Sequence, residues 1–321
     1  MDIVKVKIGL DSALEKINYT KLRLKFRAIE EIHTSEYKGS AFRGCFGESF
    51  RRVVCRYPGA KCEKCQLLHN CKFGKLYAAH LNRNHPLFGF YTHPPRPYII
   101  IPMESRERIF RHGDIFFFDL VLIGSSANLY SIIPDVVKSM VETGIGTGHS
   151  KFEAISIEYY SPNDLWYPLP ALGLPDTISI CKVVQKPINK RVTLKFETPV
   201  RFLKEKRPHK EVPSFDLLID RLAMRVSLLS HLYCSSEWVN TACSFNLGDS
   251  VKIKSEDLDW RNWARYSGTK GKVQFYDGHI GEITYEGDLK PWSKLLNIGS
   301  ILHTGSTATF GLGRYSIINY E

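Results

Sequence analysis

The chain has little continuous hydrophobic sequence. Residues 1–25 mix charged and apolar side chains throughout, so they contain no apolar core long enough for a secretory signal. No uninterrupted apolar run approaches the roughly 20 residues that a membrane helix needs. We therefore expect a cytoplasmic protein that has no membrane partner.

Several motifs of metal and nucleotide chemistry are also missing. The sequence has no Asp-rich constellation for two metal ions, no His-Glu-x-x-His motif and no phosphate loop for nucleoside triphosphates. These absences argue against chemistry of those three kinds. Histidine, lysine, tyrosine and arginine side chains remain as the groups that could support a reaction.

The composition is that of a folded, basic protein. The 321 residues are enough for two domains, and 43% hydrophobic and 12% aromatic residues support packed cores rather than disorder. A formal net charge of +11 attracts polyanions, and interleaved aromatic residues offer surfaces on which unpaired bases can stack. Nucleic-acid binding is one interpretation of this charge, and basicity without a specific partner is the other.

Four of the eight cysteines are clustered. Cys55, Cys62, Cys65 and Cys71 are separated by six, two and five residues, and glycine and proline mark residues 55–74 as a loop. Four thiolates with no open position favour a closed, structural zinc site, with no catalytic role for the metal. An iron–sulfur cluster, a redox pair and free thiols are the alternatives, and His69 is a substitute ligand.

A helix, a glycine-rich loop and a strand follow one another at two places. The first set is a helix over 130–142, a loop over 144–151 and a strand over 152–160; the second is a helix over 291–302, a loop over 303–314 and a strand over 315–319. Lys151 and Arg314 immediately precede the two strands. Each loop alone could be an ordinary helix-to-strand turn, because glycine is common after a helix. The repetition instead suggests two related domains.

The remaining periodicities fit two copies of one plan. In the first half, strands are predicted over 21–29, 98–101 and 114–123, with a helix over 41–54. In the second, strands are predicted over 191–196, 251–253 and 259–266, a helix over 215–233, and two strand pieces around Asp277 and Gly278 within 272–285. The predicted fold is α+β, with tandem ferredoxin-like (RRM-like) domains at 1–160 and 190–321 and a proline-rich connector at 161–189.

The last block, HTGSTATFGLGRYSI, resembles the C-terminal glycine-rich loop of the RAMP superfamily of CRISPR systems. It is most similar to the branch of precursor-crRNA processing endoribonucleases, in which Leu-His-x-Gly leads into Phe-Gly-Leu-Gly-Arg. The segment GSAFRGCFG at 39–47 and the cysteine loop with residues 73–77 behind it are similar to that branch as well. The resemblance implies cleavage of CRISPR repeat RNA without metal, in which a ribose 2′-hydroxyl attacks the phosphate and leaves 2′,3′-cyclic phosphate and 5′-hydroxyl ends.

The resemblance directs attention to residues near the first helix and the terminal loop. His303 is the first candidate for proton transfer and His33 the second, because histidine exchanges protons near neutral pH. Tyr37 and Lys38 are the other candidate catalytic residues, although the helix over 41–54 lacks the histidine that several family branches carry there. The candidate RNA contacts are Arg43, Arg51, Arg52, Lys151, Gly305, Ser306, Thr307, Gly311, Gly313 and Arg314.

Three functions are consistent with these residues. The first is the endoribonuclease, with repeat RNA in precursor crRNA as its partner. The second is a non-catalytic RAMP subunit that holds guide RNA in a CRISPR effector complex. The third is a zinc-containing nucleic-acid binder unrelated to CRISPR.

Overall fold

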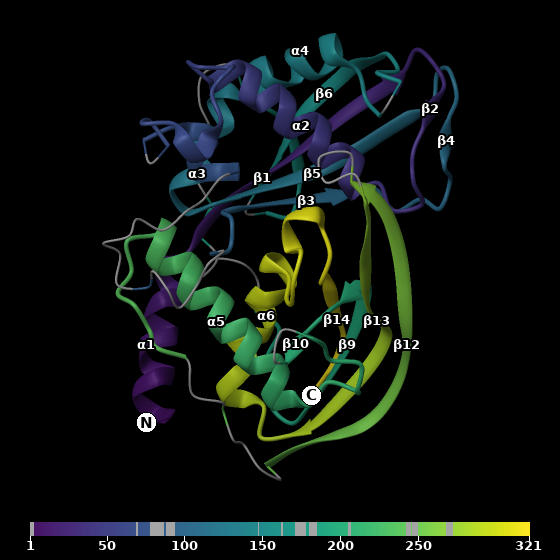
Figure 1. Ribbon diagram of the computed structural model, residues 1–321. Coiled ribbons are helices and arrows are strands. Elements are labelled where there is room, and N and C mark those ends of the chain that lie inside the picture. The colour runs from purple at the N-terminus through teal and green to yellow at the C-terminus, as the bar shows by residue number, and fades with distance from the viewer. Residues whose placement is uncertain are drawn as a thin grey trace. The chain divides into compact units, whose positions relative to one another are not determined.

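The structure is a computed structural model, and it forms two units (Figure 1). It describes residues 3–68, 70–77, 87, 94–146, 148–161, 163–170, 178–179, 185–204, 207–241, 245, 250–267 and 272–321. Ile17–Ser179 form the N-terminal unit, and Met1–Lys16 with Ile180–Glu321 form the C-terminal unit. Within the described part of the chain, no helix is long and apolar enough to cross a membrane.

The N-terminal unit is a ferredoxin-like domain. Its elements are β1 (Asn18–Ala28), β2 (Ile32–His33), α2 (Gly39–Val54), α3 (Lys72–Tyr77), β3 (Tyr98–Pro102), β4 (Ile109–Phe110), β5 (Ile115–Ile123), α4 (Ile133–Thr143), β6 (Phe152–Tyr160), β7 (Trp166–Pro168) and β8 (Ile178–Ser179). The antiparallel sheet has the order β3-β5-β1-β6-β7, which places the first long strand between the third and the fourth. This order confirms the predicted ferredoxin-like plan.

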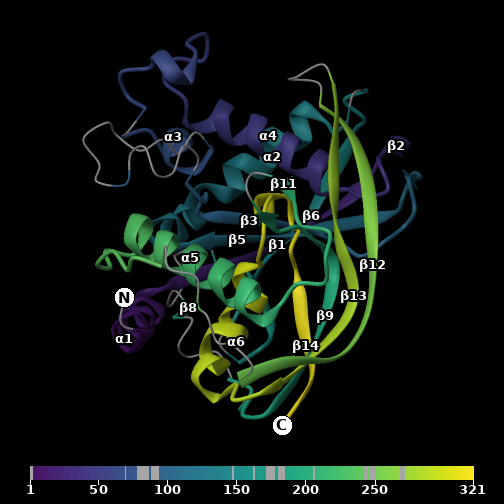
Figure 2. The ribbon, with the colours of Figure 1, turned by 60° about the horizontal axis from the view of Figure 1, so that its bottom comes forward.

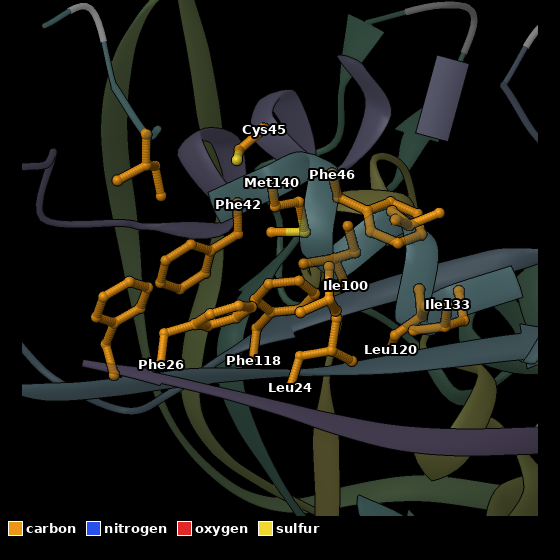
Figure 3. Close-up of a cluster of buried hydrophobic side chains, with 14 of the residues drawn as sticks. Leu24, Phe26, Phe42, Cys45, Phe46, Ile100, Phe118, Leu120, Ile133 and Met140 are labelled. Atoms are coloured by element: carbon orange, nitrogen blue, oxygen red, sulfur yellow. The ribbon is translucent and has the colours of Figure 1, made fainter. Parts of the chain in front are cut away.

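Alternation along β1 decides which face of this sheet is buried. Leu22, Leu24 and Phe26 point into the core, whereas the lysines and arginines between them lie on the opposite face. Phe42 and Phe46 of α2 pack on the buried face with Phe118 (Figure 3). The ring centroids of Phe42 and Phe118 are 5.3 Å apart and stacked, so α2 is held on the sheet chiefly by aromatic packing.

The C-terminal unit repeats the same plan. Its elements are α1 (Ile3–Lys16), β9 (Arg191–Val200), β10 (Leu203–Lys204), β11 (Arg207–Pro208), α5 (Phe215–Tyr233), β12 (Val251–Ser267), β13 (Lys272–Gly287), α6 (Ser293–Leu302) and β14 (Tyr315–Tyr320). The sheet order β12-β13-β9-β14 matches that of the first unit, strand for strand (Figure 2). The prediction of two domains of one class is therefore confirmed.

Three local predictions need correction. The pieces over 251–253 and 259–266 form one strand, β12, and the predicted break at Asp277 and Gly278 lies within β13. Pairing with β12 along the whole length keeps β13 extended, and Gly278 permits the backbone of Val200 to approach closely. The helix predicted over 130–142 begins at Ile133, because Pro134 occupies its first turn and a 3-10 segment precedes it.

Two further differences concern the ends of the predicted domains. The first helix, α1, was absent from the predicted elements, and it packs against α5 in the C-terminal unit. Residues 166–168, predicted as connector, form β7 on the edge of the N-terminal sheet. Edge pairing of Tyr159 with Tyr167 places their rings 5.8 Å apart, which explains why this short segment is extended.

Candidate nucleic-acid interface

The terminal glycine loop, residues 303–314, closes on itself. The backbone N–H of Thr304 donates to the carbonyl of Gly313 at 2.9 Å, and Nδ1 of His303 lies 3.1 Å from the carbonyl oxygen of Leu312. That second contact requires the proton on Nδ1. His303 ends α6 in a left-handed conformation, with φ of 60°, and its side chain is buried. In this structure the ring therefore holds the two ends of the loop together.

Glycine is required at two positions of this loop. A Cβ at Gly313 would lie 1.7 Å from the carbonyl oxygen of Thr304, and one at Gly305 would lie 2.6 Å from that of Arg201. Both residues also have positive φ, 73° and 70°, as does Gly311. Thr307 adopts the same region with φ of 65°, at the start of the short turn Ala308–Phe310. The composition noticed in the sequence thus reflects close backbone packing.

The end of β9 anchors the loop through Thr198. Its hydroxyl donates to the carbonyl of Gly311 at 3.1 Å and accepts from the N–H of Arg314 at 2.9 Å. The N–H of Gly313 donates to the carbonyl of Pro199 at 3.0 Å, and that of Ser306 to Arg201 at 2.9 Å. One strand end therefore fixes both sides of the loop.

Charged residues at the loop are paired with carboxylates. Nε of Arg314 contacts Oε2 of Glu197, and Nη1 of Arg201 lies 2.9 Å from Oδ1 of Asp277. Arg201, Glu197 and Asp277 were not among the predicted site residues. The only sequence signal for the first two is their position beside the end of the strand predicted over 191–196.

The first glycine loop, residues 144–151, uses a related device in the N-terminal unit. Ile145 and Ser150 exchange both backbone hydrogen bonds, at 3.1 and 3.0 Å, and a Cβ at Gly144 would lie 2.2 Å from the carbonyl oxygen of His149. Nζ of Lys151 donates to the carbonyl of Glu142 at 2.9 Å, while its N–H donates to Glu30. Lys151 therefore caps the C-terminus of α4, and it is exposed.

His33, Tyr37 and Lys38 lie in β2 and the segment that leads from it to α2. The side chain of His33 is 69% exposed, and its Nε2 is 2.8 Å from Oε1 of Glu31. Lys38 is buried, with Nζ donating to the carbonyls of Ser105 at 2.7 Å and Glu36 at 3.3 Å. Burial lowers the pKa of the Lys38 ammonium, and nearby Glu107 and Glu36 oppose that change.

The three arginines of α2 have different surroundings. Nε of Arg43 donates to the hydroxyl of Tyr98 at 2.9 Å, and its guanidinium lies 5.2 Å from the centre of the Tyr77 ring. Arg51 donates to the carbonyls of residues 58 and 60, which fixes the cysteine loop on α2. Arg52 is exposed and paired with Glu48 at 2.7 Å, one helical turn earlier. Arg52 is therefore the most accessible of the three.

The four clustered cysteines are half-buried and lie close together. Burial raises the pKa of the Cys62 thiol, Arg51 opposes this, and Cys55, Cys71 and Cys65 raise it further. Their sulfurs are thus near enough to act on one another electrostatically. Among the described residues, however, no three His, Cys, Asp or Glu side chains are arranged as a metal-ligand set. His69 lies outside the described residues.

Comparisons with known protein families divide at the same place as the two units. Residues 16–169 match a family model for an N-terminal domain, AF_1859_N. Residues 194–315 match the model of the CRISPR-associated endoribonuclease Cas6, and this segment contains most of β9, the terminal glycine loop and Arg314. The C-terminal unit is therefore Cas6-like. It is also 23% identical over 304 residues to an uncharacterized protein of Archaeoglobus fulgidus, covering 92% of this chain and 96% of that one.

Solved structures share the fold of this chain. The product complex of Cas6 (TTHB231) matches with a TM-score of 0.58 at 13% identity, over 94% of this chain and 99% of that one. Thermus thermophilus Cas6 (TTHB231) itself gives a TM-score of 0.54 at 13% identity, over the same shares of the two chains. A partial Cas6-RT-Cas1–Cas2 complex gives 0.57 at 13% identity, over 95% of this chain but 47% of that one. At this level of identity the likeness establishes the fold alone.

The close packing at Gly313 gives a stability prediction. Gly313→Ala should destabilise the C-terminal unit by at least about 2 kcal/mol, because it adds both a left-handed alanine and an overlap with Thr304. Gly44→Ala is the matched control, since nothing lies within 4 Å of that Cβ and alanine favours the interior of α2 by roughly 0.5–1 kcal/mol. Denaturant unfolding of both variants measures the difference, and equal midpoints would contradict the geometry.

Proposed function

We propose that the protein is a metal-independent endoribonuclease that cleaves CRISPR repeat RNA within precursor crRNA. A ribose 2′-hydroxyl attacks the neighbouring phosphate, the bond to the 5′-oxygen breaks, and the products carry a 2′,3′-cyclic phosphate and a 5′-hydroxyl. The observation that carries the proposal is the match of residues 194–315 to the Cas6 endoribonuclease model, because it spans the whole terminal glycine loop.

Polar groups at the terminal loop support RNA binding there. The side-chain hydroxyls of Thr304 and Ser306 are buried and have no hydrogen-bond partner among the described residues. A buried hydroxyl without a hydrogen bond costs free energy, and a bound ligand or an ordered water is the usual explanation for one. Arg314 ends the loop with a guanidinium suited to phosphate. These groups form the proposed phosphate-binding side of the reaction.

Proton transfer is assigned to histidine. The reaction needs a base for the 2′-hydroxyl and an acid for the leaving 5′-oxygen. His33 is accessible, and the Glu31 carboxylate at Nε2 orients its ring and leaves Nδ1 for exchange with the substrate. His303, with a side chain that is buried here, takes part only if RNA binding uncovers its ring. Tyr37 follows His33 toward α2, and Lys38, held by two carbonyls, fixes that segment.

A second function has one observation in its favour. His303 and Lys38, two of the four proposed catalytic residues, are 1% exposed. A RAMP subunit that binds guide RNA without cutting it requires none of these side chains to reach a scissile phosphate. Cleavage assays separate the two functions.

The first test is cleavage of RNA from the repeat nearest the gene. In EDTA, we expect one cut per repeat, and 2′-deoxy substitution at the cut site should block it because the nucleophile is then missing. A repeat of scrambled sequence is the control and should stay intact. Tight binding without a cut would assign the protein to the non-catalytic alternative, and rapid loss of cleavage in EDTA with the fold intact would refute the metal-independent mechanism.

Two histidine variants test the assigned proton transfer. His33→Ala should lower the single-turnover rate by about 10²–10⁴-fold with Kd nearly unchanged. His112→Ala is the matched control, because His112 is exposed in the same unit, with Nδ1 2.8 Å from the carbonyl of Ile29. His303→Ala is measured in parallel. A rate that survives both His33→Ala and His303→Ala would remove histidine from the mechanism.

We further propose structural zinc at Cys55, Cys62, Cys65 and Cys71, supported by their clustering in the sequence, by the electrostatic effect of the other three on Cys62 and by the preference of zinc for thiolate ligands. Freshly purified protein should contain about one equivalent, and removing it should expose four thiols to alkylation at pH 8. Cys45 is an internal control, since burial raises the pKa of its thiol to about 12 and keeps it unreactive. Less than a tenth of an equivalent of zinc would refute the site, and iron in its place would indicate a cluster.

A further inference from the structure

Arg314 of the terminal loop and Arg201, which contacts the loop from the end of β9, are both paired with carboxylates of the same unit. Arg314 contacts Glu197, with both side chains 23% exposed, and Arg201 pairs with Asp277, whose side chain is 12% exposed. Glu197 lies on β9 and Asp277 on β13, so neither belongs to the loop. Both pairs are partly buried. Charges in such places are screened less by salt than charges on an open surface.

Both arginines are also tied to the loop through their backbones. The carbonyl of Arg201 accepts from the N–H of Ser306 at 2.9 Å and lies where Gly305 has no side chain. The carbonyl of Arg314 accepts from the N–H of Glu197 at 3.0 Å, and its own N–H donates to Thr198. The backbones of both arginines therefore stay at the loop when the carboxylate partners are lost.

The Asp277 carboxylate uses only part of the Arg201 guanidinium. Nη1 faces that carboxylate, whereas Nε is buried and has no hydrogen-bond partner among the described residues. A phosphate can accept from two nitrogens of one arginine, which a single carboxylate oxygen here does not do. The contact with Asp277 thus leaves one donor of this guanidinium without a partner among the described residues.

We propose that Glu197 and Asp277 stand in for RNA phosphates and must be displaced before the loop binds its substrate; this inference rests on the proposed RNA binding at that loop. An arginine whose charge is already compensated gains less from a phosphate, and the carboxylate repels an incoming phosphodiester. RNA that makes many other contacts offsets this cost. RNA that makes few other contacts cannot offset this cost. The two carboxylates therefore select against RNA of unrelated sequence.

The experiment compares binding of repeat RNA and of scrambled RNA of equal length across salt concentrations. Glu197→Gln and Asp277→Asn should each bind scrambled RNA about three- to tenfold tighter at low salt, and repeat RNA less than that. The slope of log K against log salt should steepen by about 0.7 for each arginine released. Glu286→Gln is the matched control: it removes the same charge from a pair with Arg191 at the other end of β9, and should change binding less than twofold.

The outcomes separate the inference from the proposed function. If all three variants tighten scrambled RNA equally, net charge is the cause and the inference is wrong. The double variant Glu197→Gln with Arg314→Gln should lose the tighter binding of scrambled RNA that Glu197→Gln alone gives. If the double variant keeps that tighter binding, the inference is wrong. If wild-type protein binds neither RNA at any salt concentration, the proposed function fails and the inference fails with it. Unfolding midpoints of the variants verify that each one is folded.

Discussion

The contact between the backbones of Thr304 and Gly313 sets the form of the C-terminal unit around its terminal loop. At this point two segments approach so closely that a single methyl group would collide. The hydrogen bond from Thr304 to Gly313 closes the loop, and the Thr198 hydroxyl holds its far side. Arg314 then enters β14 in a fixed position beside β9. The placement of every polar group at the loop depends on this packing.

The first glycine loop reaches a similar end by other contacts. Gly144 passes close to the His149 carbonyl, and the Ile145–Ser150 bridge closes the loop, while Ser150 and Lys151 bond to Glu31 and Glu30 beyond the end of β1. Lys151 turns back onto α4, whereas Arg314 turns to a neighbouring strand. The two units thus share a helix, glycine loop and strand, but only the terminal loop has an arginine paired with a carboxylate on the sheet.

Much of the fold could be predicted because it follows from local patterns. Alternation in β1 and the apolar spacing of α5 gave those elements nearly their full lengths. The long β12 and β13 could not be read in the same way, because Gly278 and Gly281 interrupt the pattern and long-range pairing keeps the strand continuous. Helix α1 was not predicted because it has no acidic residue in its first turn to mark its start. It is also stabilised by packing on α5, which lies far along the chain.

The candidate site was predictable in composition but not in its pairings. The glycines and Arg314 were visible in the sequence. The pairing of Arg201 with Asp277 and of Arg314 with Glu197 depends on sheet register, which the sequence does not reveal. Pairing of this kind extends to β1, where Arg23 binds Asp119, Lys25 binds Glu158 and Arg27 binds Glu153.

The net charge of +11 already subtracts these carboxylates, so it does not tell which basic side chains remain accessible to a polyanion. Exposed pairs such as Arg27–Glu153 contribute only about 0–1 kcal/mol to stability, so their loss would scarcely affect folding. Their effect on association is larger, because each carboxylate cancels the field of a cation where a phosphate would arrive. If RNA binds here, its affinity should follow the local state of a few arginines, and the total charge of the chain should be a poor guide to it.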